Sequence, residues 1–135
     1  MAEKSLKKII ITIDGPAGSG KGRIASYLSK KWQLYHIDSG ILYRGLASVI
    51  LKNNINYLNE KKILQILTKK PKISFRNFKK LRSEDISLIT SHIATYRPVR
   101  NYINSIQRDF VKKYRKKKGF VIDGRDIGSV VFKTN

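Results

Sequence analysis

The apolar residues of this chain fall into short unbroken runs separated by longer stretches of helical spacing. The β-branched run at 8–13 predicts a strand buried on both faces, as in a parallel sheet. Runs at 34–37 and 120–122 predict two more buried strands, each followed directly by an aspartate. Apolar residues every three or four positions predict helices that begin near residues 21 and 40, and others over 60–67, 83–93 and 98–118. Strand, helix, strand, helix is the start of a right-handed βαβ unit, so the pattern favours the α/β class.

Local signals mark several boundaries of these elements. Pro71 is expected to break a helix, and residues 72–76 alternate between polar and apolar, which predicts a short half-exposed strand. Ser83, with two acidic residues behind it, predicts a helix start that its side chain caps. Gly119 is expected to end the last helix.

Composition narrows the kinds of partner. A chain of 135 residues can bury a core, and we expect one compact domain. Because it has no cysteine and no apolar stretch of membrane-spanning length, we expect a cytoplasmic protein without a membrane partner. The oligomeric state does not follow from the sequence, and a monomer is expected if the chain folds. The net charge is +20, but the cations are scattered, apart from a cluster at 112–118, and do not alternate with aromatic residues. We therefore interpret the charge as a solvated basic surface around a phosphate-handling site, with nucleic acid not favoured as a partner.

The most specific motif is a glycine-rich turn between the first predicted strand and the first predicted helix. Gly15-x-x-x-x-Gly20-Lys21 has the spacing of a phosphate-binding P-loop, whose backbone N–H groups converge on phosphate oxygens. The helix N-terminus and the Lys21 ammonium add positive charge beside the same anion. A dinucleotide-binding turn is the rival, but Arg23 replaces its third glycine and Lys21 would have no role. The residues expected to hold a nucleoside triphosphate are Gly15, Pro16, Ala17, Gly18, Ser19, Gly20, Lys21, Gly22 and Arg23.

Polar residues follow the second predicted strand, at the end where open α/β sheets bind their ligands. Asp38 and Ser39 come directly after it, although Ser39 could also simply cap the next helix. Tyr43 and Arg44 lie in the first turns of that helix. Because the same crevice is expected to hold a P-loop, we predict that Arg44 binds a second phosphate.

A second polar cluster follows the third predicted strand. Asp123 suits a role in holding Mg²⁺, directly or through water, and Arg125 could neutralise the phosphate of an acceptor. A salt-bridged turn is the alternative interpretation of this cluster. His36 and His92 lack the spacing of metal ligands, and we interpret both as structural. No residue is assigned as a direct metal ligand.

Four blocks of sequence, in order, resemble those of bacterial cytidylate kinases. They span residues 13–21, 36–40 with 43–44, 81–84, and 121–128. The resemblance implies a P-loop fold, a three-layer parallel sheet with helices on both faces. It also implies transfer of the γ-phosphoryl group of ATP to CMP or dCMP in the presence of Mg²⁺, giving ADP and CDP or dCDP.

The resemblance implies roles for individual residues as well. The residues that would surround the CMP acceptor are Asp38, Ser39, Tyr43, Arg44, Ser91, Arg100, Arg125 and Asp126. The residues that would act in phosphoryl transfer are Lys21, Arg44, Asp123 and Arg125. Ser91, Arg100 and Asp126 would read the cytosine, and only the resemblance assigns Ser91 and Arg100 any role.

The chain departs from the family pattern in three respects. Arg23 stands where these kinases usually carry a hydroxyl, so Mg²⁺ binding or catalysis is expected to be weaker. The monophosphate-binding insert, around 55–97, looks shortened. The family continues beyond residue 135 with another strand and an arginine-bearing lid, so we expect an incomplete sheet. Its first strand would have an unpaired, aggregation-prone edge, and turnover would be slight or absent. The alternatives are a catalytically inactive nucleotide-binding fragment and a basic nucleic-acid-binding protein.

Overall fold

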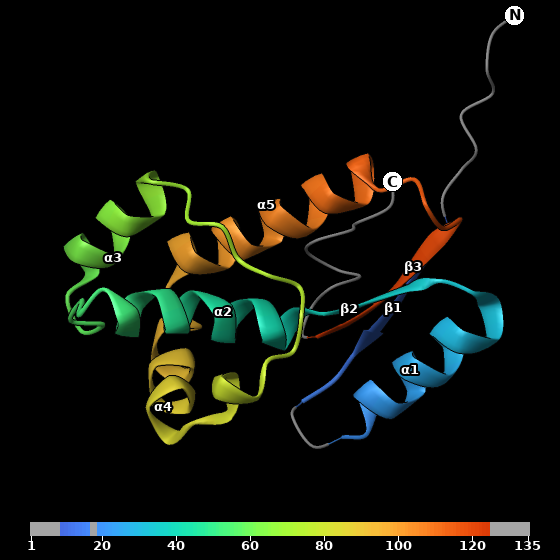
Figure 1. The fold of residues 1–135 in the computed structure, drawn as a ribbon, viewed down its shortest axis with the longest axis horizontal. Coiled ribbons are helices and arrows are strands. Elements are labelled where there is room, and N and C mark those ends of the chain that lie inside the picture. The colour runs from blue at the N-terminus through green and yellow to red at the C-terminus, as the bar shows by residue number, and fades with distance from the viewer. Residues whose placement is uncertain (1–8, 17–18, 125–135) are drawn as a thin grey trace, which may run out of the picture. The chain divides into compact units, whose positions relative to one another are not determined.

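Figure 1 shows a computed structural model of the chain, in which residues 9–16 and 19–124 are described. The chain divides into two compact units. The first combines the chain up to Asp38 with the part from Gln107 onward, and the second runs from Ser39 to Ile106. The two units are described separately below.

The first unit is built on a parallel sheet. Its described strands are β1 (Ile9–Asp14), β2 (Tyr35–Asp38) and β3 (Gly119–Gly124), in the order β1-β3-β2. The three predicted strands are therefore confirmed. The central strand, β3, is buried at every position, as its unbroken apolar run predicts.

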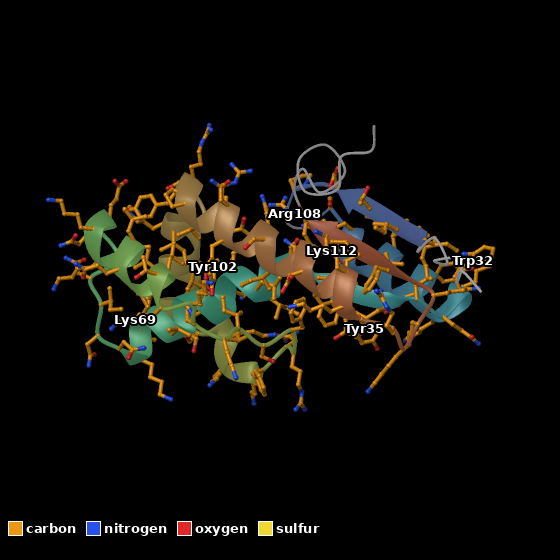
Figure 2. The ribbon with its side chains drawn as sticks, turned by 90° about the horizontal axis from the view of Figure 1, so that it is seen from above. Trp32, Tyr35, Lys69, Tyr102, Arg108 and Lys112 are labelled. Atoms are coloured by element: carbon orange, nitrogen blue, oxygen red, sulfur yellow. The ribbon has the colours of Figure 1, made fainter. Side chains whose placement is uncertain are left out.

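Helices cover both faces of this sheet. On one face, Ala25 of α1 (Lys21–Trp32) packs with Leu34 and Val121. On the other face lies the C-terminal part of α5 (Arg97–Lys113), where the Phe110 ring lies 5.1 Å from that of Tyr35. Tyr35 is labelled in Figure 2. This arrangement confirms the α/β class with a parallel sheet between helical layers.

The burial of β1 differs from the prediction. Ile9 is 47% exposed and Ile10 is 38% exposed, although the unbroken apolar run predicts burial on both faces. The reason is its place in the sheet, because β1 pairs with β3 alone among the described strands. The expected open edge of β1 is therefore present in the part of the chain that the structure describes.

A close approach fixes the start of β1 against the start of β3. Ile9 pairs with Gly119, and the Ile9 N–H donates to the Lys118 carbonyl at 3.2 Å. A Cβ atom on Gly119 would lie only 2.1 Å from the Ile9 carbonyl oxygen. Glycine is therefore required at this position by the neighbouring backbone.

The regular elements of the second unit are all helical among the described residues, and turns and loops connect them. The helices are α2 (Ser39–Lys52), α3 (Glu60–Thr68), the 3₁₀ turn η1 (Lys79–Arg82), α4 (Glu84–Ile93) and the first part of α5. The buried residues of α2 and α4 include Leu42, Leu46, Ile50, Ile86, Ile89 and Ile93. Ser83 caps α4 as predicted, since its Oγ accepts from the Ile86 N–H at 3.3 Å.

Two further predictions about elements are wrong. Residues 72–76 form no strand, because the described residues of this unit contain no strand with which they could pair. Helix α5 ends at Lys113, and Gly119 begins β3 instead of ending the helix. In α1, Ile24 and Trp32 are exposed, whereas Ala25 is buried and Leu28 packs against the same cluster.

None of the described helices combines the length and apolar character needed to cross a bilayer.

Candidate nucleotide site

The glycine-rich loop connects β1 to α1 and begins against the end of β3. The Gly15 N–H donates to the Gly124 carbonyl at 3.0 Å. A Cβ atom on Gly15 would lie 2.9 Å from the Ser19 Oγ, which is closer than ordinary contact. Gly20 has φ of 84°, a left-handed conformation that glycine adopts without strain. The left-handed φ thus requires glycine at Gly20, whereas the contact at Gly15 involves only the end of the Ser19 side chain, which can rotate away.

The N-terminus of α1 is suited to an anion. Gly20 precedes the helix and provides no side-chain cap, and the first turn contains no acidic residue. The positive end of the helix is therefore not compensated by a carboxylate of its own first turn. The Lys21 Nζ lies 3.5 Å from the Pro16 carbonyl oxygen, so the ammonium contacts the loop. Arg23 is exposed in the same turn.

The ends of the strands bring carboxylates to this edge of the sheet. Asp14 and Asp38 are the last residues of β1 and β2, and Asp123 pairs in register with Asp38. Residues paired in register project from the same face of a sheet, so Asp38 and Asp123 share a face. This is the face of Val121, which packs against α1.

Asp123 is buried and has a histidine partner. Its side chain is only 2% exposed, and its Oδ2 lies 2.5 Å from the Nε2 of His36, whose side chain is 28% exposed. Sequence interpretation treated His36 as structural and missed this contact. The alternation of β2 places His36 on the same face as Asp38, but its neighbour on β3 follows only from the sheet register.

In the second unit, two of the predicted acceptor residues are joined by a hydrogen bond. Burial raises the pKa of the Tyr43 hydroxyl, and the Arg100 guanidinium, which hydrogen-bonds to it, offsets part of that rise. Tyr43 lies in α2 and Arg100 in α5. The structure therefore brings together two residues that are 57 positions apart in the sequence.

Arg44 is held by the backbone of the 3₁₀ turn. Its Nη1 donates to the Leu81 carbonyl oxygen at 3.2 Å, and both residues belong to the second unit. This bond orients the guanidinium while leaving it other donors, because arginine carries five N–H groups. It also links two of the sequence blocks, 43–44 and 81–84.

The remaining predicted residues differ in how much the structure says of them. Ser39 is buried at the start of α2, immediately after Asp38. Ser91 is exposed on α4, and its hydroxyl donates to the Leu88 carbonyl of its own helix at 2.9 Å. The predicted residues outside the described ranges are Ala17, Gly18, Arg125 and Asp126.

A metal site requires several ligand side chains close together. Among the described residues, no three histidine or acidic side chains are grouped closely enough to hold a metal ion by themselves. The strand-end carboxylates nevertheless supply oxygen ligands, which Mg²⁺ prefers, and Mg²⁺ in kinase sites is bound by one or two carboxylates together with substrate phosphates. The donor set thus suits a metal that arrives with a nucleotide.

Comparison with known proteins points to one family. The family profile for cytidylate kinase matches residues 11–135. The chain is 36% identical to a cytidylate kinase of Fusobacterium nucleatum over 94% of its own length and 61% of that protein. It is 35% identical to a cytidylate kinase of Caldicellulosiruptor bescii, over 93% of the chain and 60% of that protein. It is also 38% identical to a bifunctional pantoate ligase/cytidylate kinase of Prochlorococcus marinus, over 93% of the chain and 27% of that protein.

Proposed function

Because the chain belongs to the cytidylate kinase family, we propose that it binds ATP at its glycine-rich loop and transfers the γ-phosphoryl group to CMP or dCMP. The observation that carries the proposal is the loop itself, with its left-handed Gly20, the uncapped helix behind it and Lys21 against it. These features favour a polyphosphate over a single carboxylate or sulfate, because they supply several donors along one path.

On the donor side, the loop, Lys21 and Asp123 would together bind ATP and its metal ion. The backbone of the loop and the N-terminus of α1 would hold the β-phosphate, and Lys21 would follow the β- and γ-phosphates. Asp123 would orient a metal-bound water or the metal itself. The chemistry that Mg²⁺ would supply, if it is bound with ATP, is neutralisation of the negative charge on the phosphates.

On the acceptor side, Arg44 and Arg100 supply the positive charge. Arg44, oriented by the Leu81 carbonyl, would pair with the phosphate of the monophosphate. Arg100, joined to Tyr43, would contact the base together with Ser91, whose hydroxyl would have to leave the Leu88 carbonyl or accept from the base. Arg125 and Asp126 would complete this set by resemblance to the family.

The proposed reaction is a direct transfer. An oxygen of the CMP phosphate forms a bond to the γ-phosphorus of ATP while the bond from that phosphorus to the β,γ-bridging oxygen breaks, releasing ADP. The protein contributes positioning and charge neutralisation, since this chemistry needs no covalent intermediate.

A second candidate function is nucleotide binding without turnover. One observation favours it: the chain spans only about 60% of the length of the cytidylate kinases that it matches. Binding would then depend on the loop and Lys21, whereas release of ADP would be absent.

The deciding experiment measures ADP release and nucleotide binding on the same sample of the 135-residue chain. ADP release is followed with ATP, Mg²⁺ and CMP, and in parallel with dCMP, UMP or AMP as the acceptor. Binding is followed with a fluorescent ATP analogue. Lys21→Ala is compared with Lys30→Ala, which changes an exposed lysine of the same helix.

The outcomes separate the candidates. ADP release that requires CMP or dCMP and is lost in Lys21→Ala but not in Lys30→Ala supports the kinase. Binding that depends on Lys21 without ADP release supports the second candidate. A folded sample that neither binds the analogue nor releases ADP refutes both.

A further inference from the structure

We propose that His36 is a positioning residue that holds the Asp123 carboxylate at the nucleotide end of the sheet. The proposal rests on the proposed function, because Asp123 is there assigned to the metal side of the nucleotide. It starts from one contact, the 2.5 Å between His36 Nε2 and Asp123 Oδ2. The two residues are 87 positions apart in sequence and lie on neighbouring strands.

The sheet register explains how the contact arises. His36 pairs with Val121, and Asp38 pairs with Asp123, so all four side chains project from the same face. His36 is therefore one diagonal step behind Asp123 on the adjacent strand. Such diagonal neighbours are within reach of a long or aromatic side chain.

Burial makes the contact consequential. A carboxyl group that is 2% exposed has little contact with water in this structure, so protein groups supply its hydrogen bonds. The bond engages Oδ2 and restricts rotation of the carboxyl group.

The backbone next to Asp123 is tied to the phosphate loop. The carbonyl of Gly124, the residue after Asp123, accepts the Gly15 N–H at 3.0 Å, which holds the end of β3 against the start of the loop. The side chain of Asp123 is fixed independently by His36. Together these two bonds set the direction of the carboxylate relative to the loop. Loss of His36 would remove this hydrogen bond from the carboxyl group without altering the loop backbone.

The experiment measures affinity for a fluorescent ATP analogue with Mg²⁺ and with EDTA, using the full 135-residue chain. His36→Phe removes the donor, and His36→Gln returns an amide N–H near the position of Nε2. Tyr35→Phe is the matched control, because it changes the adjacent residue of β2 on the opposite face. We expect His36→Phe to lose at least fivefold in affinity with Mg²⁺ and less than twofold in EDTA. His36→Gln should stay within about twofold of wild type, and Tyr35→Phe should be unchanged.

A double variant tests whether His36 acts through Asp123. Asp123→Asn combined with His36→Phe should bind no more weakly in Mg²⁺ than Asp123→Asn alone. Additive losses would overturn the proposal, and so would equal losses with Mg²⁺ and EDTA, or a glutamine variant as weak as the phenylalanine one.

Failure of the proposed function would be seen separately. If the wild-type chain does not bind the analogue, the nucleotide site is refuted. Wild type, His36→Phe, Asp123→Asn and the double variant are then compared by thermal unfolding. Shifts in Tm that are additive between the two substitutions would then overturn the contact as well. Non-additive shifts would show that His36 holds Asp123 in the absence of any nucleotide.

Discussion

Substitution of Gly119 by alanine tests the close approach between β1 and β3. The added Cβ atom would lie 2.1 Å from the Ile9 carbonyl oxygen and 2.9 Å from the Ile9 Cβ atom. To reach even 3.0 Å from that oxygen, the strands must separate by about 0.9 Å. This displacement would break the bond from the Ile9 N–H to the Lys118 carbonyl, which is already 3.2 Å long, and weaken the next ladder bond.

The expected loss of stability follows from the number of hydrogen bonds that the substitution disturbs. Each backbone hydrogen bond contributes about 1 kcal/mol net, and a buried group left without a partner costs about 1–3 kcal/mol. We therefore expect Gly119→Ala to lower the free energy of unfolding by about 2–3 kcal/mol. For a chain of this size that corresponds to a decrease in Tm of about 6–12 °C. Asp123 lies at the opposite end of β3, so nucleotide binding by the folded fraction should be retained.

The assay is thermal unfolding by far-UV circular dichroism, with amide hydrogen exchange of β1 as a local measurement. Gly22→Ala is the control, because a Cβ atom at this helical position would meet nothing within 4 Å. It should leave Tm unchanged or raise it, since alanine favours the helix by up to about 1 kcal/mol. If Gly119→Ala melts within 1 °C of wild type and β1 amides stay equally protected, the close approach is refuted.

Three further predictions concern stability. Both amide atoms of Gln107 are buried without a partner among the described residues, so Gln107→Met should raise the free energy of unfolding by about 1–2 kcal/mol. The control Gln65→Met, at an exposed position, should change it by less than about 0.5 kcal/mol. A decrease in the Tm of Gln107→Met would contradict this prediction. Ser83→Ala should cost about 1 kcal/mol in chemical denaturation through loss of the α4 cap, whereas Ser83→Asp should retain most of it. Burial raises the folded-state pKa of the Tyr43 hydroxyl above its usual 10.0. The stabilisation from its protonated form is therefore present below pH 10 and is lost as the pH rises through the folded pKa. The free energy of unfolding of Tyr43→Phe should decrease less steeply with rising pH than that of wild type, and an identical pH profile would refute this assignment.

The strands and the glycine-rich turn between β1 and α1 could be predicted from sequence because their signals are local. An unbroken apolar run, a glycine spacing and a following helical period lie within about two dozen residues, from Ile9 to Trp32. The cap at Ser83 is equally local. Each of these features depends on backbone preferences that neighbouring residues can express without the rest of the fold.

The wrong predictions concern features that depend on tertiary contacts. Ile9 and Ile10 have the composition of a buried strand, but β1 has only β3 beside it among the described strands. The residues of the apolar run carry no signal of this position in the sheet. Residues 72–76 have an alternating pattern without a strand to pair with. The link from His36 to Asp123 joins positions 87 apart, so it required the sheet register and could not be read from spacing alone.

The positive net charge acts on anions at long range, whereas the strand-end aspartates act at short range. Asp14, Asp38 and Asp123 make up one third of the nine acidic residues of a chain whose net charge is +20. At a distance, the surplus of cations attracts every polyanion, whatever its base, and raises the rate of encounter. That attraction fades as the screening length falls from about 10 Å at 0.1 M salt to about 3 Å at 1 M. Within a few ångströms the carboxylates would oppose a bare phosphate chain and favour one that carries its own cation. At the proposed nucleotide site, salt should therefore slow the arrival of nucleotides, while the carboxylates would favour those that bring a cation.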